Sequence, residues 1–232
     1  MCIRDRHIYF TGMTSIMFHA LPPRLFISVF FYAFMISIFF YSHIRNTIKS
    51  KEELFHEYIR DSLTKVYSRN YFLEMLKKEM VTADKNGLYV AMIDMNRFKY
   101  INDTYGHSFG DQVLEEVGKL LNQMDSNIAA GRVGGDEFMI YSSGIPLRDL
   151  YKEINQVIMD FRKFLTHKAM EPDNNGLGMS LGVVEVREDR ALSDSLNLCD
   201  AIMYLAKSKG NNQVIVEGID INEEDLESYR ES

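Results

Sequence analysis

The chain has 232 residues, with 46% hydrophobic and 25% charged residues, values that are ordinary for a folded protein and leave room for one domain plus an appendage. The net charge of -7 is divided unevenly, because residues 1–60 hold seven Lys or Arg against four Asp or Glu, a net of +3, and the remainder carries -10. Such an acidic remainder is a poor general nucleic-acid binder, since phosphate contacts need clustered cations, but a nucleotide can bind it where metal ions screen the phosphates.

Residues 25–44 contain no Lys, Arg, Asp or Glu and match the ~20 apolar residues that cross a bilayer, so we interpret them as a transmembrane helix. A cleaved signal peptide is the alternative, but its apolar core is only about 7–15 residues long, and no small-residue cleavage pattern follows here. Arg45, Lys49 and Lys51 come directly after the apolar run. Under the positive-inside rule they place the C-terminal side in the cytoplasm, although Arg4, Arg6 and Arg24 on the other side weaken this assignment.

The segments on either side of this helix carry less information. The first six residues, MCIRDR, resemble translated adapter sequence, so residues 1–24 are interpreted as a truncated or artefactual segment. Residues 45–60 are expected to form a linker helix whose apolar positions approximate a heptad seam, interrupted by Lys51. Two heptads leave a coiled coil and a plain connecting helix equally open.

Beyond Asp61 the chain alternates between apolar, β-prone runs and helical periodicity, which predicts an α/β fold. The predicted strands are Leu88–Ile93, Ile128–Val133, Phe138–Tyr141, Met179–Val186 and Gln213–Val216. The predicted helices are Tyr71–Val81, Gln112–Leu121, Leu147–Leu165 and Leu192–Ala206. Cys199 falls in the last helix and is expected to be a buried free thiol. Residues 218–232 form an acidic tail that is expected to fray.

Two acidic clusters adjoin predicted strands. Asp94 ends the strand Leu88–Ile93, where open α/β sheets place ligand groups, and a carboxylate there suits Mg²⁺, although an ordinary strand-ending Asp is the alternative. Val133–Phe138 is interpreted as a β-hairpin whose Gly-Gly turn permits positive φ and close approach of a ligand. Asp136 and Glu137 in this hairpin repel each other without a counter-ion, so it is either a divalent-metal site or a solvated acidic turn.

The two clusters together with the residues between them are far more specific. From Asp94 the chain reads DMNRFKYINDTYGHSFGDQVL and continues to GGDEF at Gly134–Phe138, which resembles the GGDEF (diguanylate cyclase) family pattern DxDxFKxINDxxGHxxGDxxL followed by GGDEF. DSLTKVYSRNYF at Asp61–Phe72 is similar to the family's opening motif DxLTGLxNRRxF. CDAIMYLAKSKGNN at Cys199–Asn212 is similar to its closing motif ADxALYxAKxxGRN. The resemblance covers residues 61–217 and indicates a GGDEF domain there.

The resemblance implies an α/β sandwich with a mostly antiparallel central sheet, similar to nucleotidyl-cyclase and polymerase-palm domains, preceded here by one transmembrane helix. It implies a diguanylate cyclase that condenses two GTP molecules into cyclic di-GMP and pyrophosphate by two-metal phosphoryl transfer with Mg²⁺. Each domain would bind one GTP, so a homodimer is needed for catalysis. The helix would lie in a bacterial inner membrane with the catalytic domain in the cytoplasm, and no nucleic-acid partner is expected.

The resemblance also implies roles for individual residues. Those that would hold the metal are Asp94, the Met95 carbonyl, Asp136 and Glu137. Asp136 would in addition be the base toward the ribose 3′-hydroxyl, and Lys99 would offset charge that develops on the phosphates. The residues that would bind the rest of GTP are Asn102, His107, Asp111 and Lys207. Asp111 would select guanine, because an acceptor-only carboxylate matches the N1–H and amino donors of that base.

Several positions depart from the family pattern. Asn96 replaces the second Asp of DxD, and Asn211 stands where an Arg near the phosphates is usual, a loss worth on the order of 1.5–3 kcal/mol for a charge-assisted contact. Asp125 and Ile128 occupy the Arg and Asp positions of the family's inhibitory RxxD site. A catalytically silent GGDEF domain that binds GTP and regulates a partner is therefore the alternative. A purely structural membrane-anchored module would leave the acidic clusters without a purpose.

Overall fold

The computed structural model describes residues 23–82, 87–168, 170–172 and 176–220. Most of the expected segment 1–24 and of the acidic tail 218–232 therefore lies outside the described residues. The chain divides into two compact units, Met1–Leu54 and Phe55–Ser232.

Helix α2, Pro23–Ile59, includes both the predicted transmembrane helix and the predicted linker helix without a break. Proline at its first position suits a helix start, and no Gly or Pro interrupts the residues that follow. Within α2, Arg24–Lys51 is long and apolar enough to cross a membrane, with a mean hydropathy of 2.1 and none of its apolar window buried. A signal sequence near an N-terminus meets the same criteria, so the membrane span stays a prediction.

The second unit is built on a six-stranded sheet with the order β1-β3-β4-β2-β5-β6. Its strands are β1 Tyr67–Ser68, β2 Leu88–Asn96, β3 Ile128–Arg132, β4 Glu137–Ser143, β5 Gly178–Glu185 and β6 Val214–Val216. The β3–β4, β4–β2 and β2–β5 pairs are antiparallel, whereas the outer β1–β3 and β5–β6 pairs are parallel. The sheet is thus mixed, and the prediction of a mostly antiparallel central sheet is confirmed.

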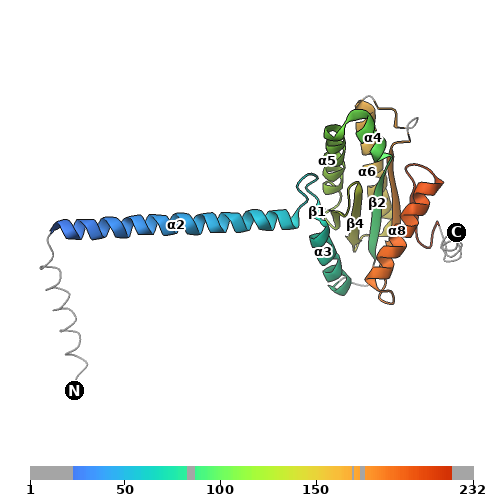
Figure 1. Cartoon of the computed structure of the whole chain (residues 1–232). Coiled ribbons are helices and arrows are strands. Elements are labelled where there is room, and N and C mark those ends of the chain that lie inside the picture. The colour runs from blue at the N-terminus through green and yellow to red at the C-terminus, as the bar shows by residue number, and fades with distance from the viewer. Residues whose placement is uncertain (1–22, 83–86, 169, 173–175, 221–232) are drawn as a thin grey trace, which may run out of the picture. The chain divides into compact units, whose positions relative to one another are not determined.

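Helices cover both faces of this sheet, as expected for an α/β sandwich (Figure 1). Strand alternation divides the apolar residues between two cores. Val90 packs on one face with Phe72 and Ile202, and Ile93 packs on the other with Val117. The first face is covered by α3 Arg69–Thr82 and α8 Leu192–Lys209, and the second by α5 His107–Asn122 and α6 Leu147–His167.

Two elements of the structure were not predicted, and strand β2 extends further than predicted. The short helix α4, Phe98–Tyr105, and the two-residue strand β1 were not predicted. Helix α4 buries only Ile101 in the core, too little for an apolar period to be visible in the sequence. Strand β2 continues to Asn96, so Asp94 lies inside the strand and not at its end. Cys199 is buried and free, as expected.

Candidate active site

Asp94 lies on β2, an interior strand that pairs with β4 on one side and with β5 on the other. In the strand register it stands opposite Glu137 of β4 on one side and Ser180 of β5 on the other. Side chains alternate along a strand, so Asp94 shares a face with Asn96, two residues further on. This is the face that α8 covers, and Lys207 from the last turn of α8 reaches Asp94 there. The prediction that Asp94 ends the strand is wrong, because Met95 and Asn96 also pair with β5.

The GGDEF segment forms the predicted hairpin between β3 and β4. The Val133 and Gly134 N–H groups both donate to the Glu137 carbonyl, at 3.0 and 3.3 Å. Glycine permits positive φ in such a turn, but neither Gly134 nor Gly135 has it. A Cβ at Gly134 would lie 2.4 Å from a carboxylate oxygen at the flexible end of the Glu137 side chain. Gly135 has open space around it, which leaves its backbone accessible.

The electrostatics of the site centre on the Asp94 carboxylate, whose side chain is only 8% exposed. Burial raises the pKa of Asp94, the nearby Asp136 and Glu137 carboxylates act in the same direction, and the Lys207 ammonium opposes them. The Lys207 Nζ lies 2.6 Å from Asp94 Oδ1. Three carboxylates thus act on one another, with one ammonium in contact with the most buried of them.

The described residues fit a divalent cation only with help from a ligand. In this part of the chain, no three His, Cys, Asp or Glu side chains are gathered closely enough to hold a metal by themselves. Mg²⁺ takes one or two protein carboxylates and fills its shell with phosphate and water oxygens, so it does not need such a cluster. The buried Asp94 carboxylate can supply one of these protein ligands, and its burial favours a cation beside it.

The expected nucleotide-binding residues come from α4 and α5, which follow β2 directly. Asn102 lies on α4, whereas His107 and Asp111 lie in the first turns of α5 and are exposed. Gly110 makes room for the Asn102 amide, because a Cβ at Gly110 would lie 2.0 Å from Asn102 Oδ1. Lys99 is exposed in the first turn of α4. The structure therefore brings Asn102 next to the turn that carries Asp111.

Arg132 ties the signature hairpin to the start of the domain, a contact that sequence reasoning missed. Its Nε and Nη2 donate to the Gly135 carbonyl at 3.1 and 2.6 Å, and its Nη1 donates to Asp61 Oδ1 at 3.1 Å. Asp61 Oδ1 also accepts from the Thr64 N–H and hydroxyl, at 2.8 and 2.6 Å. The motif D-x-L-T could have suggested the local Asp61–Thr64 bonds, whereas the distant Arg132 had no signal in the sequence.

The Asp61 contacts predict a pH-dependent contribution to stability. Burial pushes the pKa of Asp61 up, but the hydrogen bonds from Thr64 and the ion pair with Arg132 outweigh burial, so the net pKa is lowered from 3.8. A carboxyl with a depressed folded-state pKa stabilises the fold above its unfolded pKa, and this stabilisation is lost as the pH falls through the folded value. Asp61→Asn is therefore expected to lower Tm at pH 7, by roughly 2–4 °C for each kcal/mol lost.

The measurement is thermal unfolding of wild type and Asp61→Asn between pH 7 and about pH 2, well below the unperturbed Asp pKa of about 3.9. The gap between the two proteins should close as the pH falls, because Asp61 becomes protonated in wild type as well. Asp189→Asn, at an exposed turn position, serves as the matched control and should show no gap. A gap that stays constant with pH would contradict the assigned role of the carboxylate.

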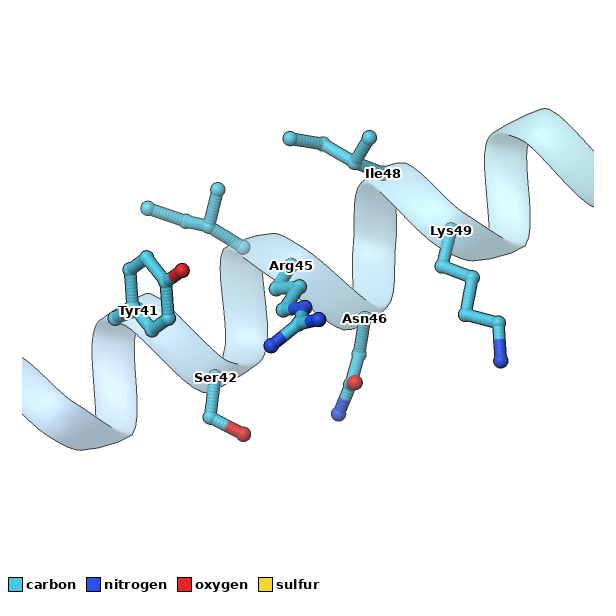
Figure 2. Close-up of a pocket in the computed structure, with 7 residues that line it drawn as sticks. Tyr41, Ser42, Arg45, Asn46, Ile48 and Lys49 are labelled. Carbon is cyan, nitrogen blue, oxygen red and sulfur yellow. The ribbon is translucent and has the colours of Figure 1, made fainter.

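A hollow along α2 lies away from these residues. It is lined by residues of this helix alone, and Figure 2 shows their side chains leaving one helical turn after another. They are Tyr41, Ser42, Ile44, Arg45, Asn46, Ile48 and Lys49. One helix without an opposing wall does not enclose a ligand, so this hollow is no candidate for the chemistry.

Comparison with known proteins agrees with this geometry. The family model described as "Diguanylate cyclase, GGDEF domain" matches residues 58–213. The probable diguanylate cyclase DgcT of Escherichia coli (strain K12) is 29% identical over 192 residues, which cover 79% of this chain and 40% of that protein. The diguanylate cyclase DosC of Shigella sonnei is 30% identical over 187 residues, covering 75% of this chain and 40% of that protein. The chain thus spans about two fifths of these curated relatives' length.

Solved structures share the fold. The coiled coil and GGDEF domain of DgcB from Caulobacter crescentus, solved in complex with c-di-GMP, superposes with a TM-score of 0.64 at 20% identity. The match covers 75% of this chain and 94% of that one. At this level of identity the likeness supports the architecture of the sheet and its helices.

Proposed function

Because the chain belongs to the GGDEF domain family, we propose that it is a diguanylate cyclase that condenses two GTP molecules into cyclic di-GMP and pyrophosphate. The observation that carries the proposal is the buried Asp94 carboxylate beside the signature hairpin, with Glu137 opposite it in the register and Lys207 in contact. Curated relatives named diguanylate cyclase support the same class of enzyme.

The proposed roles are those that the resemblance to the GGDEF family implies. Asp94, the Met95 carbonyl, Asp136 and Glu137 would hold Mg²⁺ at the edge where β2 meets β4. Bound Mg²⁺ would supply two-metal chemistry, lowering the pKa of the attacking hydroxyl and neutralising charge on the α-phosphate. Asp136, next to the open Gly135 backbone, would accept the proton of the ribose 3′-hydroxyl.

The remaining residues would bind and orient the nucleotide. Asn102 and Asp111 present an amide and a carboxylate that match the guanine edge, and His107 lies between them in the chain. Lys99 would stand near the phosphates, since helix α4 begins one residue after Arg97, and exposed helix N-termini favour anions. Lys207 would hold the β- and γ-phosphates.

Assembly and location are part of the proposal. One domain binds one GTP, so two copies must face each other, and a homodimer is required for turnover. The apolar helix Arg24–Lys51 would anchor the protein in a bacterial inner membrane and raise the effective concentration of the pair, with the catalytic domain in the cytoplasm.

The direct test is incubation of the full chain, purified in detergent micelles, with GTP and Mg²⁺, followed by detection of cyclic di-GMP by mass spectrometry. Cyclic di-GMP and pyrophosphate in a ratio of one to two are expected. GTP binding without product would instead favour a silent regulatory domain, an alternative that Asn211 keeps open because it removes the usual Arg. Neither binding nor product would overturn the proposed function.

We also expect no strong product inhibition through the family's usual secondary site. That site requires a guanidinium and a carboxylate that clasp the ligand, whereas this chain has Asp125 and Ile128 at those positions. The Asp125 carboxylate is engaged locally, since it accepts from the Asn127 N–H at 2.8 Å. Arg132 is no substitute, because its donors are directed to Gly135 and Asp61.

Calorimetric titration of cyclic di-GMP into the full chain, with a non-hydrolysable GTP analogue filling the active site, measures this directly. No binding tighter than micromolar is expected. Sub-micromolar binding by wild type would show an inhibitory site at another place.

A further inference from the structure

The Lys207 ammonium lies at the carboxylate that is expected to bind a metal ion. The resemblance implies that Lys207 binds phosphate and that Asp94 binds the metal, yet in the structure the two side chains bind each other. Lys207 Nζ is 2.6 Å from Asp94 Oδ1, and the two side chains are 36% and 8% exposed. A substrate-binding ammonium is thus in contact with the carboxylate assigned to the metal.

The packing of α8 on the sheet fixes this contact from one side. A Cβ at Gly182 of β5 would lie 2.4 Å from the Met203 nitrogen and 2.6 Å from the Cys199 carbonyl, so α8 rests directly on the strand. The Cys199 thiol donates to the Gly182 carbonyl at 3.1 Å. Lys207 follows Met203 by four residues, so it lies on the same sheet-facing side of α8, one turn further along.

Buried hydrogen bonds between the sheet and the segment that follows α8 also hold the Lys207–Asp94 contact in place. Asn96 Nδ2 donates to Ser180 Oγ at 2.9 Å, and the Ser180 hydroxyl lies 3.2 Å from Asn96 Oδ1. The Asn212 N–H donates to the same Asn96 oxygen at 3.4 Å. Asn96 and Ser180 are buried on the face of the sheet that carries Asp94. The segment that follows Lys207 is therefore bonded to the strand that carries Asp94.

The side chain of Asn212 completes this attachment. Its Oδ1 accepts from the Met179 N–H at 3.2 Å, and its backbone has φ of 58°. Gly178 leaves the space for it, because a Cβ there would lie 1.9 Å from Asn212 Oδ1. With Gly182 before it and Asn212 after it, the last turn of α8 has little freedom to move its backbone, so Lys207 stays within reach of Asp94.

The charges explain why an ammonium belongs there. Asp94 is buried and faces Glu137 across the strand pair, with Asp136 adjacent in the hairpin. A buried carboxylate without a counter-ion is strongly unfavourable, more so beside two further carboxylates. A divalent ion and the ammonium both need the Asp94 oxygens, and two cations so close to one another repel. Their occupancies at Asp94 must therefore compete.

We infer that Lys207 is the resident counter-ion of Asp94 in the metal-free protein, and that a divalent cation binding at Asp94 displaces its ammonium toward the phosphates of the nucleotide. The inference rests on the proposed function for the identity of the metal site. Lys207 then has two partners one after the other, first Asp94 and then the nucleotide phosphates. Metal binding stays weak until a nucleotide accepts the displaced ammonium.

The first test is thermal unfolding of the full chain in detergent micelles without nucleotide. Circular dichroism monitors the unfolding, once in EDTA and once in Mg²⁺. Lys207→Met should lower Tm in EDTA by at least about 2–4 °C, because it leaves Asp94 unpaired. Mg²⁺ should restore most of that loss while changing wild type little. Lys209→Met, an exposed lysine in the same last turn of α8, is the matched control and should behave as wild type.

Binding of Mn²⁺, measured by the electron paramagnetic resonance signal of the free ion, is the second test. Without nucleotide, Lys207→Met should bind Mn²⁺ at least about tenfold more tightly than wild type, because the competing charge is gone. Lys207→Arg retains a cation and should stay near wild type. Equal Mn²⁺ affinity in wild type and Lys207→Met, or equal Tm gains from Mg²⁺, would overturn the inference.

The outcomes separate this inference from the proposed function. Formation of cyclic di-GMP by wild type together with metal affinities that ignore Lys207 would remove the inference alone. Metal binding that competes with Lys207, in a protein that binds no GTP, would remove the proposed function and leave the counter-ion role standing.

Discussion

Asp136→Asn is expected to abolish formation of cyclic di-GMP while the domain unfolds at nearly the wild-type temperature. Asp136 is only partly buried directly before β4, and the amide keeps the shape of the side chain. The substitution removes the negative charge that would help to hold the metal, and it removes the proposed base toward the 3′-hydroxyl. General-base catalysis alone is typically worth about 10²–10⁴-fold, so the combined loss should exceed that.

The measurement is the rate of cyclic di-GMP formation by mass spectrometry, with Tm from circular dichroism recorded on the same preparation. Asp189→Asn makes the same chemical change at an exposed turn and should retain full activity. Product formation at the wild-type rate by a folded Asp136→Asn protein would contradict the catalytic assignment of the signature hairpin.

A strict preference for GTP over ATP is the second large effect that we expect. Asn102 and Asp111 would pair with guanine in the proposed site, and a site built on hydrogen bonds rejects a ligand that leaves them unpaired by about 10⁴-fold or more. Gly110 supports this pairing, since only a residue without Cβ leaves the Asn102 amide in place. Asp111→Ala should lower kcat/KM for GTP by roughly 10–100-fold, the loss of one charge-assisted pair.

Turnover of GTP and ATP by wild type and Asp111→Ala, each over a range of concentrations, gives the two ratios. Glu115→Gln, one turn further along α5 and exposed, is the control for removing a negative charge from that helix. Comparable turnover of ATP by wild type, or an unchanged kcat/KM for GTP in Asp111→Ala, would show that another group selects the base.

The elements with a strong apolar period were predictable from the sequence. Strands β2 and β5 are buried almost throughout, and α6 carries a regular apolar face, so both patterns were visible without a structure. The pairing of Tyr67 and Ser68 with Gly131 and Arg132 depends on residues more than sixty positions away, and no local signal predicts it. The predicted ends of strands were inaccurate for the same reason, because Asn96 is a strand residue only through its pairing with Gly178.

The candidate site was predictable as a set of residues and not as a set of contacts. The motif order placed Asp94 and the hairpin together, and the register puts Glu137 directly opposite Asp94. Glycine permits positive φ in such a turn, but neither Gly134 nor Gly135 has it, so the residue types alone did not determine the backbone of the hairpin. The Lys207–Asp94 ion pair joins positions that are distant in the chain, so a reading that gives each motif its own ligand could not anticipate it.

The order of the strands has a consequence for how two copies of the domain can meet. The outer strands of the sheet are its shortest, with two residues in β1 and three in β6. A long bare edge invites another chain to add a strand, and short edges are one way in which proteins prevent such aggregation. Strand addition offers little here, so the proposed pairing of two active sites would have to form through helices and loops.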